Sequence, residues 1–96
     1  MYELIIPNKA KRDIKNLDKP VIKKVIQLLE ELSENPSTGI RLVGDLGHLL
    51  KVEFYMQGVS YRIVYEILQY RIQVKIIQVG SRENFYEELR RRISAM

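Results

Sequence analysis

Basic and phenolic side chains are the groups of this 96-residue chain that could do chemistry. Lys51 alternates with apolar residues in one predicted strand, and Arg62 stands in the next predicted strand. Arg82 and Tyr86 are four residues apart in a predicted final helix, so we expect them on one face of it. If the strands are adjacent, these four side chains converge on one basic patch that can bind phosphate.

The same residues also fit a purely structural interpretation. Lys51 and Arg62 can pair with Glu53 and Glu66 across the sheet, because opposite charges on neighbouring strands attract. Arg82 would then be a surface residue in the first turn of a helix. The pattern of residues alone leaves both interpretations open.

Other kinds of catalytic site lack the residues they need. The chain has no cysteine, and its one histidine, His48, stands in a loop-like segment where we expect a surface or turn residue. The pairs Glu30-Glu31 and Glu87-Glu88 fall on the polar sides of predicted helices. Four glycines fit turns and no phosphate-binding loop: Gly44, Gly47, Gly58 and Gly80. We therefore expect no metal site and no cofactor.

The net charge of +4 is unevenly distributed along the chain. Residues 1–36 hold seven Lys or Arg against six Asp or Glu, whereas residues 37–96 hold nine against six. Seven of those nine are arginines, whose planar guanidinium suits phosphate better than an ammonium does. An arginine-rich second half favours a nucleic acid or another polyanion as partner.

The length of the chain fits a single domain, 1–96. No apolar run approaches the roughly 18 residues of a membrane helix. The N-terminal residues lack the basic start, apolar stretch and cleavage site of a signal peptide. The absence of cysteine agrees with a reducing cytosol. We therefore expect a cytoplasmic protein with no membrane partner.

Two helices are predicted in the first third of the chain. A short strand, Tyr2–Ile6, ends at Pro7, and Asn8 is placed to cap the first helix. Asp18 is placed to cap the second helix, with Pro20 in its first turn. The apolar face of that helix comprises Ile22, Val25, Ile26, Leu29 and Leu32, widened by Val21 and Leu28. The tight turn between the helices indicates an antiparallel hairpin lying across a flat surface.

A sheet supplies that surface. Alternating apolar residues predict three strands, Leu50–Met56, Tyr61–Leu68 and Arg71–Val79. Ile77 and Val79 break the alternation, which predicts a bulge or burial on both faces. Gly80 ends the third strand, and Ser81 is placed to cap a final helix. The predicted fold is α+β, in the order β-α-α-β-β-β-α, with an antiparallel sheet and the helices packed on one face.

Two short motifs, in their order along the chain, resemble those of the RelE/ParE toxin superfamily, and of RelE-type toxins in particular. Ser60–Ile67 is similar to the "YR-V-Y" strand of those toxins. Ile76–Glu83, followed by Tyr86, is similar to their apolar strand ending in "VG-R" and the tyrosine that begins their last helix. The segment Leu42–Leu46 and the order of elements resemble the family too. The resemblance covers nearly the whole chain.

The resemblance implies the toxin of a type II toxin–antitoxin system, an mRNA interferase. Such an endoribonuclease cleaves mRNA without a metal, at the ribosome, by attack of a ribose 2′-hydroxyl on the adjacent phosphate. By position, Lys51 matches the lysine that activates the hydroxyl, and Arg62 matches the arginine that binds the scissile phosphate. Arg82 matches the arginine that stabilises the phosphate or the leaving group, and Tyr86 the tyrosine that stacks on a base.

Two positions depart from the family pattern. Glu53 stands where ribosome-dependent relatives often have a second lysine, so it can replace that lysine as a general base or partly neutralise the patch. Val43 stands where many relatives have a basic residue, and Arg41 is the nearest substitute. We therefore expect Arg41 and Glu53 to contact RNA beside the catalytic residues.

The resemblance leaves two other functions open. A ParE-like toxin shares the fold but inhibits DNA gyrase by binding to it, without any cut in RNA. A catalytically weak homologue would act mainly by binding its antitoxin, and Glu53 makes that alternative possible. The expected partners are a cognate antitoxin protein, mRNA and the ribosome.

Overall fold

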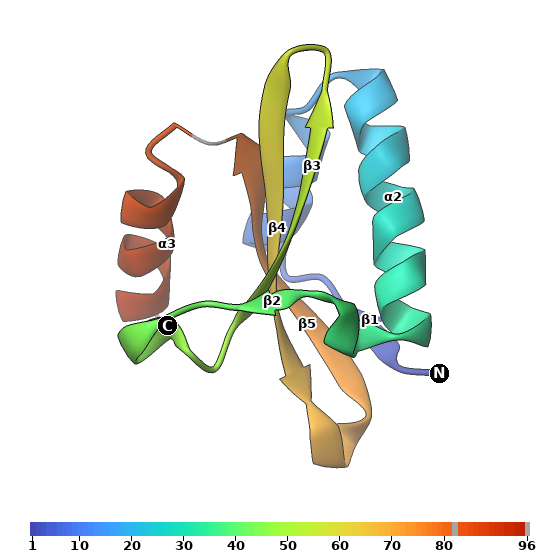
Figure 1. Cartoon of the computed structure of the whole chain (residues 1–96), viewed down its shortest axis with the longest axis vertical. Coiled ribbons are helices and arrows are strands. Elements are labelled where there is room, and N and C mark those ends of the chain that lie inside the picture. Colours follow the sequence, from blue (N-terminus) through green and yellow to red (C-terminus); the bar gives the residue numbers. More distant parts are fainter. Residues whose placement is uncertain (82, 96) are drawn as a thin grey trace.

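The computed structural model describes residues 1–81 and 83–95 of the chain (Figure 1). The strands are β1 (Glu3–Ile5), β2 (Ile40–Arg41), β3 (Leu50–Met56), β4 (Val59–Leu68) and β5 (Gln73–Ser81). The helices are α1 (Asn8–Lys15), α2 (Lys19–Glu34) and α3 (Phe85–Ser94). The α+β class and the order of the predicted elements are confirmed, with the two-residue strand β2 added. None of the described helices is long and apolar enough to cross a membrane.

The five strands form one sheet in the order β1-β5-β4-β3-β2. Strands β3, β4 and β5 pair antiparallel, as predicted, and β2 pairs antiparallel with β3. The expectation of a wholly antiparallel sheet is wrong at one edge, where β1 lies parallel to β5. These two strands are far apart in the sequence, so no hairpin turn between them imposes an antiparallel pairing.

Helices α1 and α2 cover one face of the sheet. Val21, Val25 and Leu29 of α2 are buried there, whereas Ile26, expected on the apolar face, is 50% exposed. The apolar stripe of α2 is wide, so the spacing of its residues does not determine which of two neighbouring positions, such as Val25 and Ile26, points at the sheet. The buried side chains of this core are Ala10, Val21, Val25, Leu29, Leu32, Leu50, Tyr61, Ile63, Tyr65, Val74, Ile76 and Val79.

Helix α3 packs on the opposite face, so the expectation that all helices share one face is wrong (Figure 1). Val64 lies opposite Gln78, and Tyr65 lies opposite Ile76, which leaves Ile77 without a partner on β4. This bulge, predicted from the broken alternation, turns Ile77 toward α3. A second core results, with Leu46, Leu49, Val64, Ile77, Phe85 and Leu89 as its buried members.

The starts of two helices differ from the prediction. The first helix begins at Asn8 itself, with Pro7 in the capping position. The last helix begins at Phe85 after Asn84, whose left-handed backbone (φ 55°) ends the preceding turn, so Ser81 does not cap it. Asp18 does stand in the capping position of α2, although its side chain makes no capping hydrogen bond.

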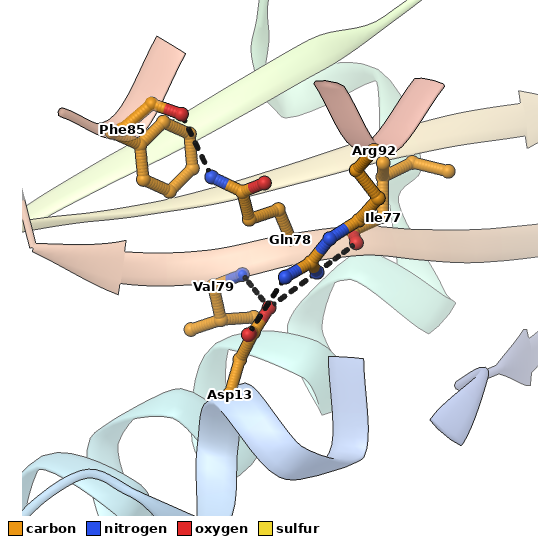
Figure 2. Close-up of polar contacts among 6 residues, drawn as sticks. All are labelled: Asp13, Ile77, Gln78, Val79, Phe85 and Arg92. Carbon is orange, nitrogen blue, oxygen red and sulfur yellow. Dashed lines mark hydrogen bonds and ion pairs between the residues drawn. The ribbon is translucent and has the colours of Figure 1, made fainter. Parts of the chain in front are cut away.

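Polar contacts join α3 to β5 and α1 (Figure 2). Asp13 of α1 accepts two hydrogen bonds from the guanidinium of Arg92, at 2.7 and 3.0 Å, and a third from Val79 N at 3.0 Å. Arg92 also donates to Ile77 O at 2.9 Å. Strand β1 covers β5 only along Gln73–Lys75. The Asp13–Arg92 pair therefore occupies backbone groups of β5 that β1 leaves unpaired.

A second contact holds the first turn of α3. The side chain of Gln78, 2% exposed, donates from Nε2 to Phe85 O at 2.9 Å (Figure 2). Since Phe85 is itself buried in the second core, the first turn of α3 is fixed by an apolar anchor and a polar one. The next residue along, Tyr86, is thereby placed over the sheet.

Candidate active site

Strands β3 and β4 and helix α3 bring together three of the four predicted catalytic residues. Lys51 and Glu53 of β3 lie on the face that α3 covers, because side chains alternate between faces and Leu49 packs in the second core. Glu53 is directly opposite Arg62 of β4. Tyr86, in the first turn of α3, packs at the edge of the same core. The cluster therefore lies at the edge of the second core, where β3 and β4 face the first turn of α3.

The phenol of Tyr86 contacts both cations. Lys51 Nζ donates a hydrogen bond to Tyr86 Oη at 3.3 Å and lies 5.9 Å from the centre of its ring. The guanidinium carbon of Arg62 lies 5.4 Å from the same centre, within the range of a cation–π contact. The predicted convergence of Lys51, Arg62 and Tyr86 is thus what the fold produces.

Glu53 forms ion pairs with both cations. Its Oε2 lies 2.6 Å from Arg62 Nε and 3.6 Å from Lys51 Nζ. The structural interpretation of the sequence is therefore correct for Glu53. Glu66, the second predicted partner of the two cations, lies opposite Lys75 on the sheet. In the described part of the chain it forms no ion pair with Lys51 or Arg62. The same residues make the ion pairs and the basic patch.

The guanidinium of Arg62 has unused hydrogen-bonding capacity. Its side chain is 11% exposed, and its Nε and Nη1 atoms are buried without a hydrogen-bond partner among residues 1–81 and 83–95. The close contact with Glu53 is thus an ion pair in which the N–H is not aimed at the carboxylate. Buried donors without partners are costly and rare, so each of them calls for an explanation, and an anion bound at this point would supply one.

A groove of about 410 Å³ lies beside the cluster. Its lining is Ile40, Arg41, Leu42, Val43, Leu46, Lys51, Tyr86 and Arg90. Arg41, predicted to contact RNA, stands at this groove and donates to Gly47 O at 3.0 Å. Val43, the departure from the family pattern, is 86% exposed there. The groove thus has apolar walls and three cations.

Arg90 is a groove residue that the sequence analysis missed. It donates to both carboxylate oxygens of Asp45, at 3.0 and 3.3 Å. The available signal was its spacing of four residues from Tyr86, which puts the two side chains on one face of α3. The pair with Asp45 is exposed, so it contributes little to stability and can open.

Arg82 lies outside the described residues, so its predicted role stays a prediction. The strand that leads to it is described: Gly80 lies opposite Arg62, and Ser81 lies opposite Tyr61. Because α3 begins at Phe85, the helix that was expected to carry both Arg82 and Tyr86 starts later than predicted.

The other residues considered as chemical groups lie outside the cluster. His48 is exposed in a turn, as predicted, and the pairs Glu30-Glu31 and Glu87-Glu88 are exposed on their helices. Within the described ranges, no three His, Asp or Glu side chains are grouped to hold a metal ion. Burial raises the pKa of Tyr65, whose hydroxyl donates to Pro36 O at 2.6 Å and accepts from Gly39 N at 3.0 Å. Tyr65 thereby anchors the segment that leads into β2.

Comparison with known proteins places the chain among bacterial toxins. Residues 4–90 match the family model described as the ParE-like toxin of the type II bacterial toxin–antitoxin system. No curated protein sequence matches the chain.

Solved structures of RelE proteins are similar over nearly their whole length. A mutant of the Escherichia coli toxin RelE in the free state has a TM-score of 0.76 at 24% identity, over 96% of this chain and 97% of that one. The RelBE2 toxin–antitoxin complex of Mycobacterium tuberculosis has a TM-score of 0.72 at 25% identity, over 84% and 98%. The archaeal RelE–RelB complex of Pyrococcus horikoshii has a TM-score of 0.64 at 19% identity, over 85% and 96%.

Proposed function

Since this chain belongs to the ParE-like toxins of bacterial type II toxin–antitoxin systems, we propose that it stops growth by cutting mRNA. The observation that carries this proposal is the contact of Tyr86 with two cations. Its hydroxyl oxygen lies 3.3 Å from Lys51 Nζ, and the centre of its ring lies 5.4 Å from the guanidinium carbon of Arg62. A toxin that only bound a protein target would have no evident need for a phenol over two cations. The cluster has instead the groups that RNA cleavage requires.

RNA carries its own nucleophile, so the enzyme has to align it, remove its proton and stabilise the phosphorane. In the proposed reaction the 2′-oxygen attacks the adjacent phosphorus and the bond to the 5′-oxygen breaks. The products are a 2′,3′-cyclic phosphate and a 5′-hydroxyl. The proton of the 2′-hydroxyl passes to Lys51, the leaving 5′-oxygen gains a proton from water, and Arg62 binds the phosphate on which charge develops. One such preorganised donor stabilises a transition state by about 3–4 kcal/mol.

The remaining residues hold the RNA in place. Tyr86 offers its ring to a base, a contact that contributes roughly 1–3 kcal/mol. Arg41 and Arg90 are groove cations that we assign to the RNA backbone, and Arg82 to the phosphate or the leaving group. Glu53 forms ion pairs with two cations of the cluster, Arg62 and Lys51, at the surface of the site. A groove this small positions RNA best when the ribosome holds the mRNA, so we propose cleavage in the decoding site.

The proposed partner in the cell is a cognate antitoxin. The similar M. tuberculosis structure is a toxin–antitoxin complex, and the P. horikoshii structure is a complex of RelE with RelB. A segment with acidic residues would complement the cations of the groove and cover it. A toxin that acts on mRNA would work in the cytoplasm, and we propose that location for this protein.

A second function is favoured by one specific observation. Glu53 already neutralises part of the charge of Arg62 and Lys51, which fits a catalytically weak toxin whose main partner is its antitoxin. The ParE name of the family model also keeps gyrase inhibition as a competing mechanism.

One experiment separates these functions. Wild type is expressed under an inducible promoter beside Arg62→Ala, Arg82→Ala and a matched control, Arg71→Ala, whose side chain is exposed in the turn after β4. Growth, cleavage of cellular mRNA by primer extension and gyrase supercoiling are measured at equal protein levels. The proposal predicts arrest and cut mRNA with wild type and Arg71→Ala only. Arrest with intact mRNA and inhibited gyrase would contradict it, and no arrest would favour the antitoxin-binding alternative.

A further inference from the structure

The proposed active site contains one acid between two cations. Glu53 Oε2 lies 2.6 Å from Arg62 Nε and 3.6 Å from Lys51 Nζ, so one carboxylate serves both. These are the two positive groups that the proposed reaction assigns to the phosphate and its neighbouring hydroxyl. Glu53 therefore occupies the electrostatic position that a substrate phosphate needs.

The contact is poorly matched on the side of Arg62. Glu53 approaches Nε closely, yet Nε and Nη1 remain without a hydrogen-bond partner in the described part of the chain. A guanidinium binds an anion best through two parallel N–H groups, each aimed at an oxygen. A phosphodiester has two free oxygens that can accept from two such groups together, whereas Glu53 is tied to the backbone of β3 and offers Oε2 alone to Nε.

Glu53 is also able to leave. Its side chain is 40% exposed, whereas that of Arg62 is 11% exposed, so the arginine is fixed and the carboxylate borders solvent. Among residues 1–81 and 83–95, Glu53 is held by two ion pairs, both through Oε2. An ion pair of this kind is worth little once water can solvate the carboxylate.

We propose that Glu53 is an internal counter-anion, which a substrate phosphate must displace from Arg62 before the site can act. The identification of that anion as an RNA phosphate rests on the proposed function. Because the carboxylate is attached to the protein, its effective concentration at Arg62 is high, and a single phosphate competes with it poorly. A short free RNA is therefore bound weakly, and RNA that further contacts hold against Arg41 and Arg90 is bound well.

The test compares Glu53→Gln with wild type, using a short single-stranded RNA whose 2′-hydroxyls are methylated. Methylation removes the nucleophile, so binding is measured without cleavage. The control is Glu66→Gln, which makes the same change in charge on β4 and forms no ion pair with Arg62. Four residues along a strand separate positions 62 and 66 by about 13 Å, beyond the screening length at moderate salt.

Glu53→Gln is expected to bind this RNA about threefold to fivefold more tightly than wild type in moderate salt, the effect of losing one exposed ion pair. Glu66→Gln is expected to change affinity by less than about twofold. Equal tightening in the two variants, or no tightening in Glu53→Gln, would overturn the proposal. Glu53→Ala serves as a second variant: it too must tighten binding, because the cause is the lost charge.

A direct reading of Arg62 makes the test independent of RNA cleavage. The nitrogen-15 NMR signal of its Nε–H is followed while inorganic phosphate is added. The proposal expects the signal to shift at lower phosphate concentration in Glu53→Gln than in wild type. It is overturned if phosphate leaves the signal of the variant unchanged. Tightening without any RNA cleavage by wild type would refute the proposed function alone, and cleavage without tightening would refute the counter-anion alone.

Discussion

The protein contains two arginine–carboxylate pairs that differ in how completely the arginine is used. Arg92 donates two hydrogen bonds to Asp13 and one to Ile77 O, and Asp13 also accepts from Val79 N. Arg62 lies as close to Glu53, yet two of its buried nitrogens have no hydrogen-bond partner among the described residues. One pair is complete, and the other leaves donors free.

The difference separates structure from function. The Asp13–Arg92 pair binds backbone groups at the edge of β5 that β1 leaves unpaired, and it joins helices on opposite faces of the sheet (Figure 2). Its role is therefore structural. Both of its side chains are 17% exposed, so neither has room to exchange partners. The Arg62–Glu53 pair has one fixed member and one member at the surface. Such an incomplete pair is what a site for an external anion needs.

The largest expected effect is on catalysis, from Arg62→Ala. We expect RNA cleavage to slow by about 100-fold or more, the effect of losing one preorganised donor at the phosphate. The free energy of unfolding is expected to change by less than about 1 kcal/mol, because the Glu53 carboxylate left behind is 40% exposed and water can solvate it. Single-turnover cleavage and urea unfolding measure the two quantities. A large loss of stability would contradict the functional assignment of this pair.

The converse variant is Asp13→Ala. We expect it to lower the free energy of unfolding by about 3 kcal/mol, because Arg92 and Val79 N would both lose their acceptor. Asp13→Asn keeps an oxygen for Val79 N and is expected to cost less. Urea unfolding of the three proteins checks the order. If Asp13→Ala is as stable as wild type, the pair has no structural role.

Tyr86 tests the functional pair from the side of α3. We expect Tyr86→Ala to weaken binding of methylated RNA about tenfold, since a base loses its stacking partner. Tyr86→Phe keeps the ring and should keep most of that affinity, but it loses the acceptor for Lys51 and should cleave more slowly. Equal affinity of the alanine variant and wild type would rule out stacking.

The smallest effect is a dependence of stability on alkaline pH. Burial raises the pKa of Tyr65, so above the ordinary tyrosine value of about 10 the unfolded chain loses this proton before the folded one does. The contribution is fully present below that pH and is lost as the pH rises through the pKa of the folded state. Tyr65→Phe should unfold with a weaker dependence on pH in this range. An unchanged slope would assign the dependence to other groups.

The site residues on the strands could be predicted from the sequence, because the alternation of side chains along a strand determines the face of the sheet on which each one lies. Lys51, Glu53 and Arg62 are found together because strands alternate with a period of two and the strands are consecutive. The bulge at Ile77 was visible for the same reason. Helix α3 is different: its stripe shows which of its sides is apolar, but not which face of the sheet it covers. Arg90 was missed for that reason.

The Asp13–Arg92 pair carried no local signal at all. Its members are 79 residues apart, and each looks like an ordinary charge on the polar side of a helix. Their meeting depends on where β1 stops covering β5, which is a property of the assembled sheet. Sequence spacing likewise indicated Ser81 as the cap of α3, although Asn84 in a left-handed conformation precedes that helix.

The central claim is that the cluster of Lys51, Arg62 and Tyr86 cuts mRNA. The most direct test is to add the purified protein to a translating extract with a defined mRNA and to analyse the chemistry of the RNA ends. We predict 2′,3′-cyclic phosphate and 5′-hydroxyl ends with wild type, and neither with Arg62→Ala. Intact mRNA in the presence of folded wild type, together with loss of gyrase supercoiling, would contradict the claim.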